Sequence, residues 1–365
     1  MNENEMSRVL EYVRSLSFDL QKLREILLAN LVLIGEIPSP TGEEQNRIAF
    51  LEERWAEYGL LDCATDELGN GVAILPGQKG DSTILLVAHA DTPFALTEDH
   101  TYSVNSSRVF GPGVADNSLG VAVLSSLPLF FEKLNIQLQS DLCFLVPVRH
   151  LDQGDQEGLK FFLGNIKNPV DAAIVVEGAQ LGRLNFRSMA TLGGKITCQI
   201  NRRISQESAI NVLCHVVSRL NKMDLPQENH TLLTLGAIEG GVSYKYPARN
   251  GELKFQIRSN SGQTIEKITG VIYNILDDIS LQPGVSAHLT PIAHTSSGGL
   301  DSSHPFVLAA RQIQATLDIV PQDSIYSPAI SAFAEYNIPG LCIGITLAEN
   351  INYLDEFIEI EPIMK

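Results

Sequence analysis

The sequence has few of the features on which nucleic-acid-binding, secreted and membrane proteins depend. Only 26 basic residues stand against 43 acidic ones, and the net charge of −17 argues against nucleic acid or an anionic membrane as a partner. The N-terminus shows no basic start followed by an apolar run and a small-residue cleavage site, and we expect no apolar stretch of the ~18–20 residues that span a bilayer. We therefore predict a soluble, cytoplasmic protein.

Cysteine is also scarce, which limits the ways in which the chain could be cross-linked. The five cysteines are odd in number, widely spaced and mostly set in apolar runs: Cys63, Cys143, Cys198, Cys214 and Cys342. This pattern indicates reduced core residues rather than a disulfide framework or a zinc knuckle.

The sequence does contain enough apolar residues to form two hydrophobic cores. The chain of 365 residues exceeds the usual range of a single core, and 44% of it is hydrophobic. Strand-like, near-continuous apolar segments occur at 69–75, 82–91, 141–148 and 171–178. Helical patterns separate them, at 118–134 and near 156–164, which indicates an α/β sheet covered by helices on both faces.

Two helices are predicted before the first of these strands. Residues 6–35 have helical periodicity and stop at Pro38 and Pro40. Thr41 is expected to cap a second helix that ends near Gly59, since acidic residues follow Thr41 in what would be the first turn.

The pattern changes near residue 190. A strand, a helix, two strands, a helix and a strand follow in that order, which is typical of an α+β sandwich with its own core. Afterwards α/β character resumes. We therefore predict a catalytic-type α/β domain formed by residues 1–187 and 292–365, interrupted by an inserted α+β domain at 188–291.

A histidine and an aspartate end one of the apolar strands. In LLVAHADTP, the period of two places the side chains of His89 and Asp91 on one face. His89 could bind a metal ion while Asp91 orients its ring. Taken alone, a hydrogen-bonded structural pair is the commoner explanation of such a motif.

Two further carboxylates occupy positions suited to a metal. Asp116 lies in the glycine-rich turn GPGVADNSLG, where it could bridge two metal ions or simply cap the helix at 118–134. Glu177 ends the apolar strand DAAIVVEG, where a carboxylate is costly unless it is paired, metal-bound or able to reach solvent.

The order of these motifs carries more weight than any one of them. His-x-Asp, an Asp turn and a strand-end Glu, together with SPTGEE, DELGNGVAILPG, LGAIEGGVS, FAEYNIPGLCIG and EFIEIEPI, resemble the dizinc metallohydrolases that include acetylornithine deacetylase, succinyl-diaminopimelate desuccinylase and glutamate carboxypeptidase. The resemblance implies a zinc-exopeptidase-like mixed sheet between helices, with the inserted domain as a lid that forms a homodimer. It also implies a small peptide or an N-acyl amino acid as substrate.

The resemblance assigns one metal to His89, Asp116 and Glu177. The second metal of the family takes the same aspartate, the second Glu of a Glu-Glu pair, and a His near the C-terminus; the first Glu of the pair is the general base. That pair belongs directly after the strand at 141–148, where this chain has His150 at the base position and Leu151 at the ligand position.

Other positions also depart from the family. A different register would pair Gln156 and Glu157 with the two glutamates, at the expense of about six extra loop residues. Asn352 stands where the C-terminal His is expected, and Lys245 stands where the lid of the family has an Asn. Because leucine cannot bind a metal, the resemblance implies a single zinc ion, or none.

Two hypotheses follow. In the first, slightly favoured, the chain has lost most hydrolase activity and keeps the fold, the dimer and one metal. In the second it is an active mononuclear zinc amidohydrolase or peptidase in which His150 is the base and Asp91 supports His89, because imidazole titrates near neutral pH.

Overall fold

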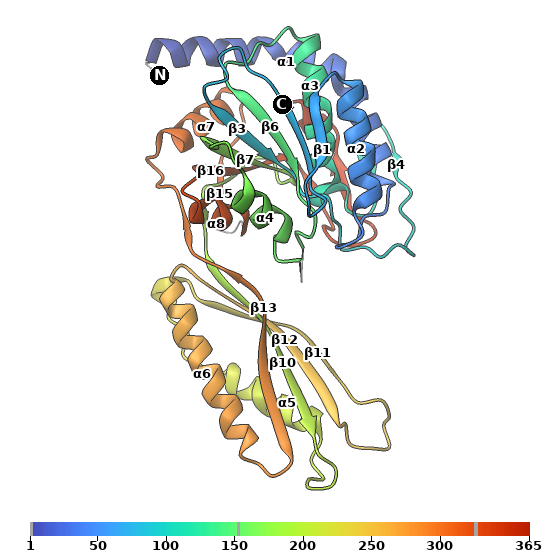
Figure 1. The fold of residues 1–365 in the computed structure, drawn as a ribbon, viewed down its shortest axis with the longest axis vertical. Helices are drawn as coiled ribbons and strands as arrows, with labels where there is room; N and C mark the ends of the chain where they lie inside the picture. Colours follow the sequence, from blue (N-terminus) through green and yellow to red (C-terminus); the bar gives the residue numbers. More distant parts are fainter. Residues whose placement is uncertain (1–2, 152–153, 325–327) are drawn as a thin grey trace. The chain divides into compact units, whose positions relative to one another are not determined.

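The computed structural model describes residues 3–151, 154–324 and 328–365. The chain forms two compact units (Figure 1). The catalytic-type unit contains residues 1–187 and 299–365, and the inserted unit contains Ser188–Gly298.

The catalytic-type unit is built on an eight-stranded mixed sheet (Figure 1). Its strands, in spatial order, are β1 (Leu61–Thr65), β2 (Gly71–Leu75), β6 (Asp141–Val146), β3 (Thr83–Val87), β7 (Ala172–Ala179), β16 (Gly340–Thr346), β8 (Arg183–Asn185) and β15 (Gln322–Ser324). The central strands β6, β3, β7 and β16 run parallel, while β2 is antiparallel to β6. Ligand-binding residues of such sheets gather beyond the carboxyl ends of the parallel strands.

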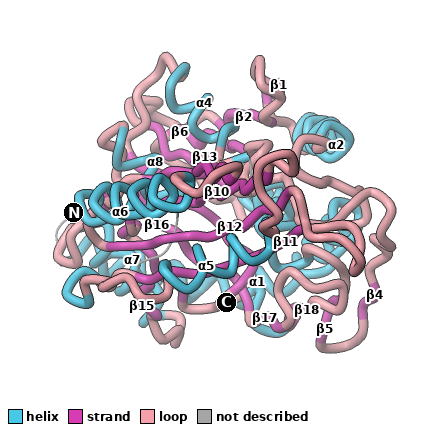
Figure 2. The backbone as a smooth tube through the Cα atoms, turned by 90° about the horizontal axis from the view of Figure 1, so that it is seen from below, coloured by secondary structure: helices cyan, strands magenta, loops and turns pink. Residues whose placement is uncertain are grey.

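Helices cover both faces of this sheet, as the strand patterns predict (Figure 1; helices are cyan in Figure 2). One face packs against α1 (Glu3–Gly35), α2 (Gln45–Glu57) and α3 (Leu119–Lys133), and the other against α4 (Glu157–Asn165) and α8 (Pro328–Glu335). A further helix, α7 (Pro305–Thr316), packs Val307 against Leu184 and Leu341. Within β3, Leu86 faces the first core and Leu85 the second, which follows from the period of two along a strand. The predicted fold class is confirmed.

One apolar segment is longer than the sequence pattern indicated. Val114–Lys133 has the length and mean hydropathy of a membrane-spanning helix, so the expectation that no stretch reaches that length is wrong. However, 72% of this stretch is buried inside the protein, where α3 packs against α1 and β7. It is a core helix, and cytoplasmic localisation stays a prediction.

A small second sheet brings the end of the chain to the segment before α3. It contains β17 (Ala348–Glu349), β18 (Phe357–Glu359), β5 (Arg108–Phe110) and β4 (Ser103–Val104). Phe357 pairs with Phe110 across β18 and β5. The pairing places Glu356 beside the glycine-rich turn that carries Asp116.

The inserted unit is a four-stranded antiparallel sheet with two helices. In spatial order its strands are β11 (Leu232–Gly240), β12 (Asn250–Ser259), β10 (Ala190–Ile200) and β13 (Val285–Thr295), and its helices are α5 (Ala209–Leu220) and α6 (Gly262–Ser280). Both helices pack on the same core as Ile196, Leu253 and Phe255. β13 pairs with β10 as far as Thr295.

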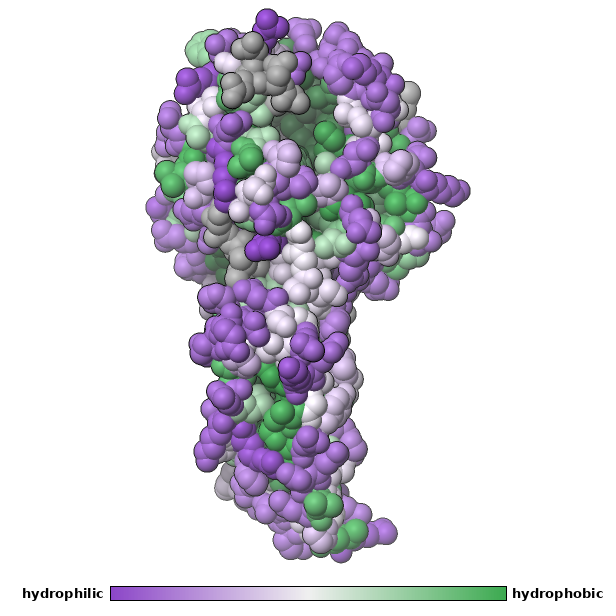
Figure 3. Space-filling model, turned by 90° about the vertical axis from the view of Figure 1, so that its left-hand side faces the viewer, coloured by the Kyte–Doolittle hydropathy of each residue, from purple (hydrophilic) through white to green (hydrophobic). Residues whose placement is uncertain are grey.

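Apolar side chains interrupt the polar surface in several places (Figure 3). In the inserted unit the most exposed are Val242, Tyr244 and Leu281, at 104%, 95% and 82%. Scattered single residues of this kind are normal, whereas a contiguous group marks an interaction surface.

Candidate metal centre

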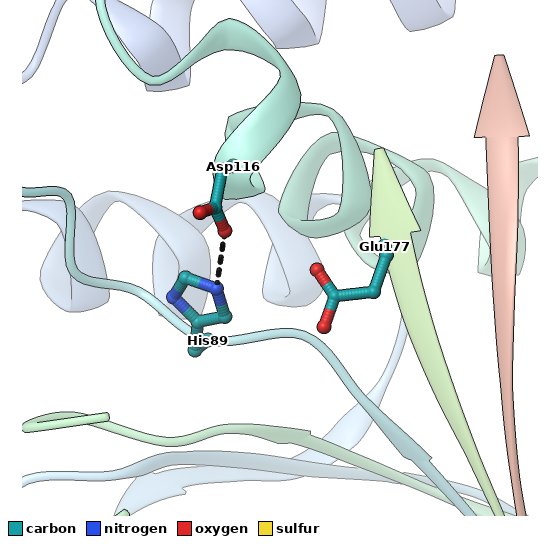
Figure 4. Close-up of side chains that lie close together, drawn as sticks. All are labelled: His89, Asp116 and Glu177. Carbon is teal, nitrogen blue, oxygen red and sulfur yellow. Dashed lines mark hydrogen bonds and ion pairs between the residues drawn. The ribbon is translucent and has the colours of Figure 1, made fainter. Parts of the chain in front are cut away.

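His89 lies just beyond the end of β3 and is almost fully buried. Its Nδ1 lies 3.0 Å from the carbonyl oxygen of Asp91 and 3.2 Å from Asp91 Oδ1, while its Nε2 lies 3.0 Å from Asp116 Oδ1 (Figure 4). Burial alone would lower the pKa of His89, but the hydrogen bonds to Asp116 and Asp91 raise it well above its ordinary value. Asp91 therefore fixes the ring so that Nε2 faces the other two predicted ligands.

Asp116 sits in the turn Val114–Ser118 that leads into α3. The turn starts at Gly113, whose φ of 72° lies in the left-handed region and where a Cβ atom would come within 2.5 Å of Thr92 Cγ2. The alternative prediction, that Asp116 caps α3, is wrong: Ser118 is the N-cap residue, and no side chain caps it. The Asp116 carboxylate instead accepts a hydrogen bond from His89.

Glu177 is held next to Asp116 by a buried amide. Asn117 Nδ2 donates to the carbonyl of Val176 at 2.8 Å, and Asn117 Oδ1 accepts from the amide of Gly178 at 2.9 Å, so the two bonds bracket Glu177. Burial, and then the nearby charge of Asp116, raise the pKa of Glu177 above its ordinary value. A cation at this place would offset both effects.

The three predicted metal ligands converge. Single ligand atoms of His89, Asp116 and Glu177 all lie within 4.8 Å of one another, and their side chains point to a common point in Figure 4. Imidazole nitrogen and carboxylate oxygen are both zinc ligands, and three protein ligands leave the open position that a catalytic site needs. The residues present therefore fit a metal ion, although the arrangement does not identify which one.

His150 lies against His89 rather than in solvent. The two rings stack with centroids 4.4 Å apart and an interplanar angle of 5°, and Nδ1 of His150 is buried with no partner among the described residues. Burial, and then the charge of His89, lower the pKa of His150 to about 4. The imidazole is therefore neutral at neutral pH.

Asp91 also fixes the loop that carries His150. Its Oδ2 accepts hydrogen bonds from the amides of His150 at 3.0 Å and Leu151 at 2.8 Å. Burial would raise the pKa of Asp91, but the bond from His89 and these amides hold the pKa well below the ordinary range. The same carboxylate thus positions both histidines.

The other register assigns the two positions to residues at the start of α4. Gln156 is the N-cap residue of α4 with a φ of 60°, and Glu157 is exposed and pairs with Arg149 at 3.1 Å. The register through His150 and Leu151 puts the His150 ring against His89. Asp152, in the same loop, lies outside the described residues.

Asn352 lies where the sequence comparison expects a histidine ligand. Its backbone amide donates to Glu356 Oε2 at 3.1 Å, and its side chain contributes to lowering the pKa of Asp116. Asparagine at this position lacks the imidazole nitrogen that the resemblance assigns to a second metal.

Three supporting residues escaped the sequence reasoning. Glu356 is fully buried and accepts from the amides of Gly113, Ala115, Asp116 and Asn352, at distances of 2.7 to 3.2 Å. Burial raises its pKa to about 7. Asn117 is the second such residue, and the only signal for either was a polar residue within an apolar context.

Thr41 is the third, and its predicted role is wrong. α2 begins at Gln45 with Glu44 as the N-cap residue and no side-chain cap, so Thr41 does not cap this helix. Thr41 Oγ1 instead donates to Asp91 Oδ2 at 2.8 Å.

Comparisons with known proteins match part of the chain by sequence and nearly all of it by fold. Residues 70–147, which include His89 and Asp116, match the model of Peptidase family M28. A putative [LysW]-lysine/[LysW]-ornithine hydrolase of Thermococcus kodakarensis is 46% identical over 57 residues, which is 16% of this chain and 16% of that relative. The chain therefore matches only a small part of this relative's length.

Solved structures resemble the chain over nearly its whole length. A tripeptidase of Staphylococcus aureus has a TM-score of 0.75 at 18% identity and covers 93% of this chain and 94% of its own. A dipeptidase of Saccharomyces cerevisiae has a TM-score of 0.78 at 13% identity, covering 96% and 95%. A dinuclear metal-binding peptidase of the M20 family from Bacillus subtilis has a TM-score of 0.66 at 14% identity, covering 94% and 95%.

At these identities the structural likeness shows the fold alone. The narrower grouping with acetylornithine deacetylase, succinyl-diaminopimelate desuccinylase and glutamate carboxypeptidase stays a prediction. The chain has the fold of M20-type metallopeptidases, and its segment 70–147 matches Peptidase family M28.

Proposed function

We propose that this chain is a peptidase- or deacylase-type metallohydrolase that holds one metal ion and has little or no hydrolase activity. The observation that carries the proposal is the identity of two residues that the resemblance aligns with ligands of a second metal, Leu151 and Asn352. Leucine has no donor atom, and its backbone amide bonds to Asp91, while Asn352 lowers the pKa of Asp116 but has no imidazole.

The remaining residues support binding of one ion. His89, Asp116 and Glu177 would hold it, and Asp91 would orient His89 through Nδ1. When bound, such an ion supplies Lewis-acid polarisation of a carbonyl group and acidification of water. The two hydrogen bonds of the Asn117 side chain to Val176 and Gly178 hold the backbone of Glu177 next to that of Asp116.

Of the steps of hydrolysis, the transfer of a proton to a general base has the weakest support among the residues of this site. A base works best when its pKa lies near the working pH. The pKa of His150, at about 4, leaves the ring neutral but weakly basic. Loss of an effective base costs about 10²–10⁴-fold in rate.

The second candidate function is an active mononuclear zinc amidohydrolase or peptidase with His150 as the base. The observation that favours it is the stacking of His150 on His89 with a buried, unpartnered Nδ1. The substrate in either case would be a small peptide or an N-acyl amino acid, by likeness of fold to the peptidases named above. We propose no nucleic-acid or membrane partner, in line with the net charge of −17.

Metal content and turnover together test the proposal. We expect purified protein loaded with zinc to bind one ion per chain and to hydrolyse dipeptides and N-acyl amino acids at rates that His150→Ala does not change. Turnover that His150→Ala abolishes would instead establish the mononuclear enzyme. Two ions bound with equal occupancy would contradict the assignment of Leu151 and Asn352.

We also propose that the inserted unit forms a homodimer along β11. This strand is the edge of its sheet, with no strand beyond it among residues 188–298. Ile238 on β11 is 51% exposed, and it lines an apolar hollow of about 300 Å³ with Cys214 and Val217 of α5. Unpaired edges and uncovered apolar grooves favour association.

A charge on this edge should separate the two copies. We expect Ile238→Lys to convert a dimer to a monomer at micromolar concentration, since a buried lysine opposite its symmetry mate is costly. Light scattering after size-exclusion chromatography measures the mass. The control is Leu281→Lys. Leu281 follows the end of α6 and is 82% exposed, and α6 packs against β13, the strand at the opposite edge of the sheet. A monomeric wild type would contradict the proposal.

A further inference from the structure

The turn Ser39–Glu44 is fixed to the segment that follows β3. Ser39 Oγ donates to the carbonyl of Ala90 at 2.9 Å, and the amide of Thr92 donates to the carbonyl of Ser39 at 2.8 Å. Pro40 also forms a parallel bridge with Thr92. These bonds lie on either side of Asp91, so the turn and the metal-ligand segment form one piece of structure.

The same turn reaches the loop that carries His150. Glu44 is 2% exposed, and its Oε1 accepts from the amide of Arg149 at 2.8 Å and from the amide of Gly42 at 2.9 Å. Two loops that are far apart in the sequence therefore share one anchor.

Asp91 is the point at which these connections meet. Its side chain is fully buried, Oδ1 faces His89 Nδ1, and Oδ2 accepts three hydrogen bonds. Two of the three donors are the amides of His150 and Leu151, and the third is the Thr41 hydroxyl at 2.8 Å. A carboxylate held by several donors at fixed angles cannot rotate, and its orientation sets that of His89.

We propose that Thr41 is a positioning residue for the metal centre, acting on His89 through Asp91. This inference rests on the proposed one-metal function. Without the hydroxyl, Asp91 Oδ2 keeps only donors from the His150 loop, and the carboxylate can follow the movements of that loop. Residues in the shell behind metal ligands change affinity by about 10–100-fold, and Thr41 lies one bond farther out, so we expect about a 10-fold effect.

The test measures zinc affinity by competition with a chromogenic chelator, using full-length protein stripped of metal. Thr41→Val keeps the shape and loses the donor, and should raise the Kd for zinc about 10-fold. Thr41→Ser restores a hydroxyl and should return the Kd to within about twofold of the wild type. The control is Thr101→Val, which removes an exposed threonine hydroxyl, on a residue whose backbone amide bonds to Asp99, and should leave the Kd unchanged.

A change of affinity counts only if the metal-free variants unfold at the wild-type temperature. Thr41→Ala is a second deletion of the hydroxyl, to be used if the valine variant does not fold. The inference alone is overturned if the wild type binds one zinc and deletion of the hydroxyl leaves Kd unchanged, or if Thr41→Ser weakens binding as much as Thr41→Val. A wild type that binds no metal would overturn the proposed function together with it.

Discussion

Replacing His150 and Leu151 with glutamate and Asn352 with histidine should yield a chain that binds two zinc ions and hydrolyses dipeptides about 10²–10⁴-fold faster than the wild type. The reason is that the backbone at these positions is already in place. Asp91 holds the amides of residues 150 and 151, and the backbone amides of residues 352 and 116 bond to the same carboxylate, that of Glu356. Metal content per chain and kcat on dipeptides measure the two effects.

A matched control isolates the ligand from the base. The control combines His150→Glu and Asn352→His with Leu151→Gln in place of Leu151→Glu. Glutamine has the length of glutamate but no carboxylate, so this control should bind one ion.

The triple variant should also lose stability when it holds no metal. Its added carboxylates repel those of Asp116 and Glu177, so it should unfold at a lower temperature than the wild type and regain stability with zinc. One bound ion and no gain in rate would show that residues 150, 151 and 352 do not occupy the ligand and base positions.

Replacing His89 with alanine should weaken zinc binding by more than about 100-fold, because it removes one of the three proposed ligands rather than a supporting residue. Zinc at about 100 times the wild-type Kd should raise the free energy of unfolding of the wild type by about 2.7 kcal/mol and that of the variant by at most about 0.4 kcal/mol. Chemical denaturation with and without zinc measures the difference.

His100→Ala provides the control for the loss of a buried imidazole. His100 is also buried in the catalytic-type unit, but its Nε2 bonds to the carbonyl of Ala95 and it is not one of the three ligands. This variant should keep the zinc-dependent stabilisation. Retention of wild-type affinity by His89→Ala would mean that any bound ion lies elsewhere.

The sheet of the catalytic-type unit could be predicted because its strands bury both faces. Near-continuous apolar runs such as TILLV in β3 leave little choice but a sheet covered on both sides. The strand-end positions of His89 and Glu177 follow from the same pattern. Hydropathy could not show that Val114–Lys133 is a core helix, because an apolar helix in a core and one in a bilayer have the same composition.

The supporting residues could not be predicted, because their roles depend on partners that are distant in the sequence. Thr41 beside two acidic residues has the local pattern of a helix cap, yet its hydroxyl bonds to Asp91 on another segment. Asn117 next to a metal ligand resembles any turn residue until the strand on which it acts, β7, is known. The sequence indicated His150 by its position after the strand, but it could not show that the ring stacks on His89, because the two residues lie on different segments.

The anchoring of the Asp116 turn by Glu356 has a consequence for the order of folding. The backbone amides of Gly113, Ala115 and Asp116 donate to the carboxylate of Glu356. Ala115 and Glu356 are 241 residues apart in the sequence. A contact of such sequence separation closes a long loop and forms late. During synthesis the proposed ligands His89 and Asp116 emerge long before the carboxylate that fixes the Asp116 turn, so we expect the proposed ion to be acquired by the finished chain rather than by the nascent one.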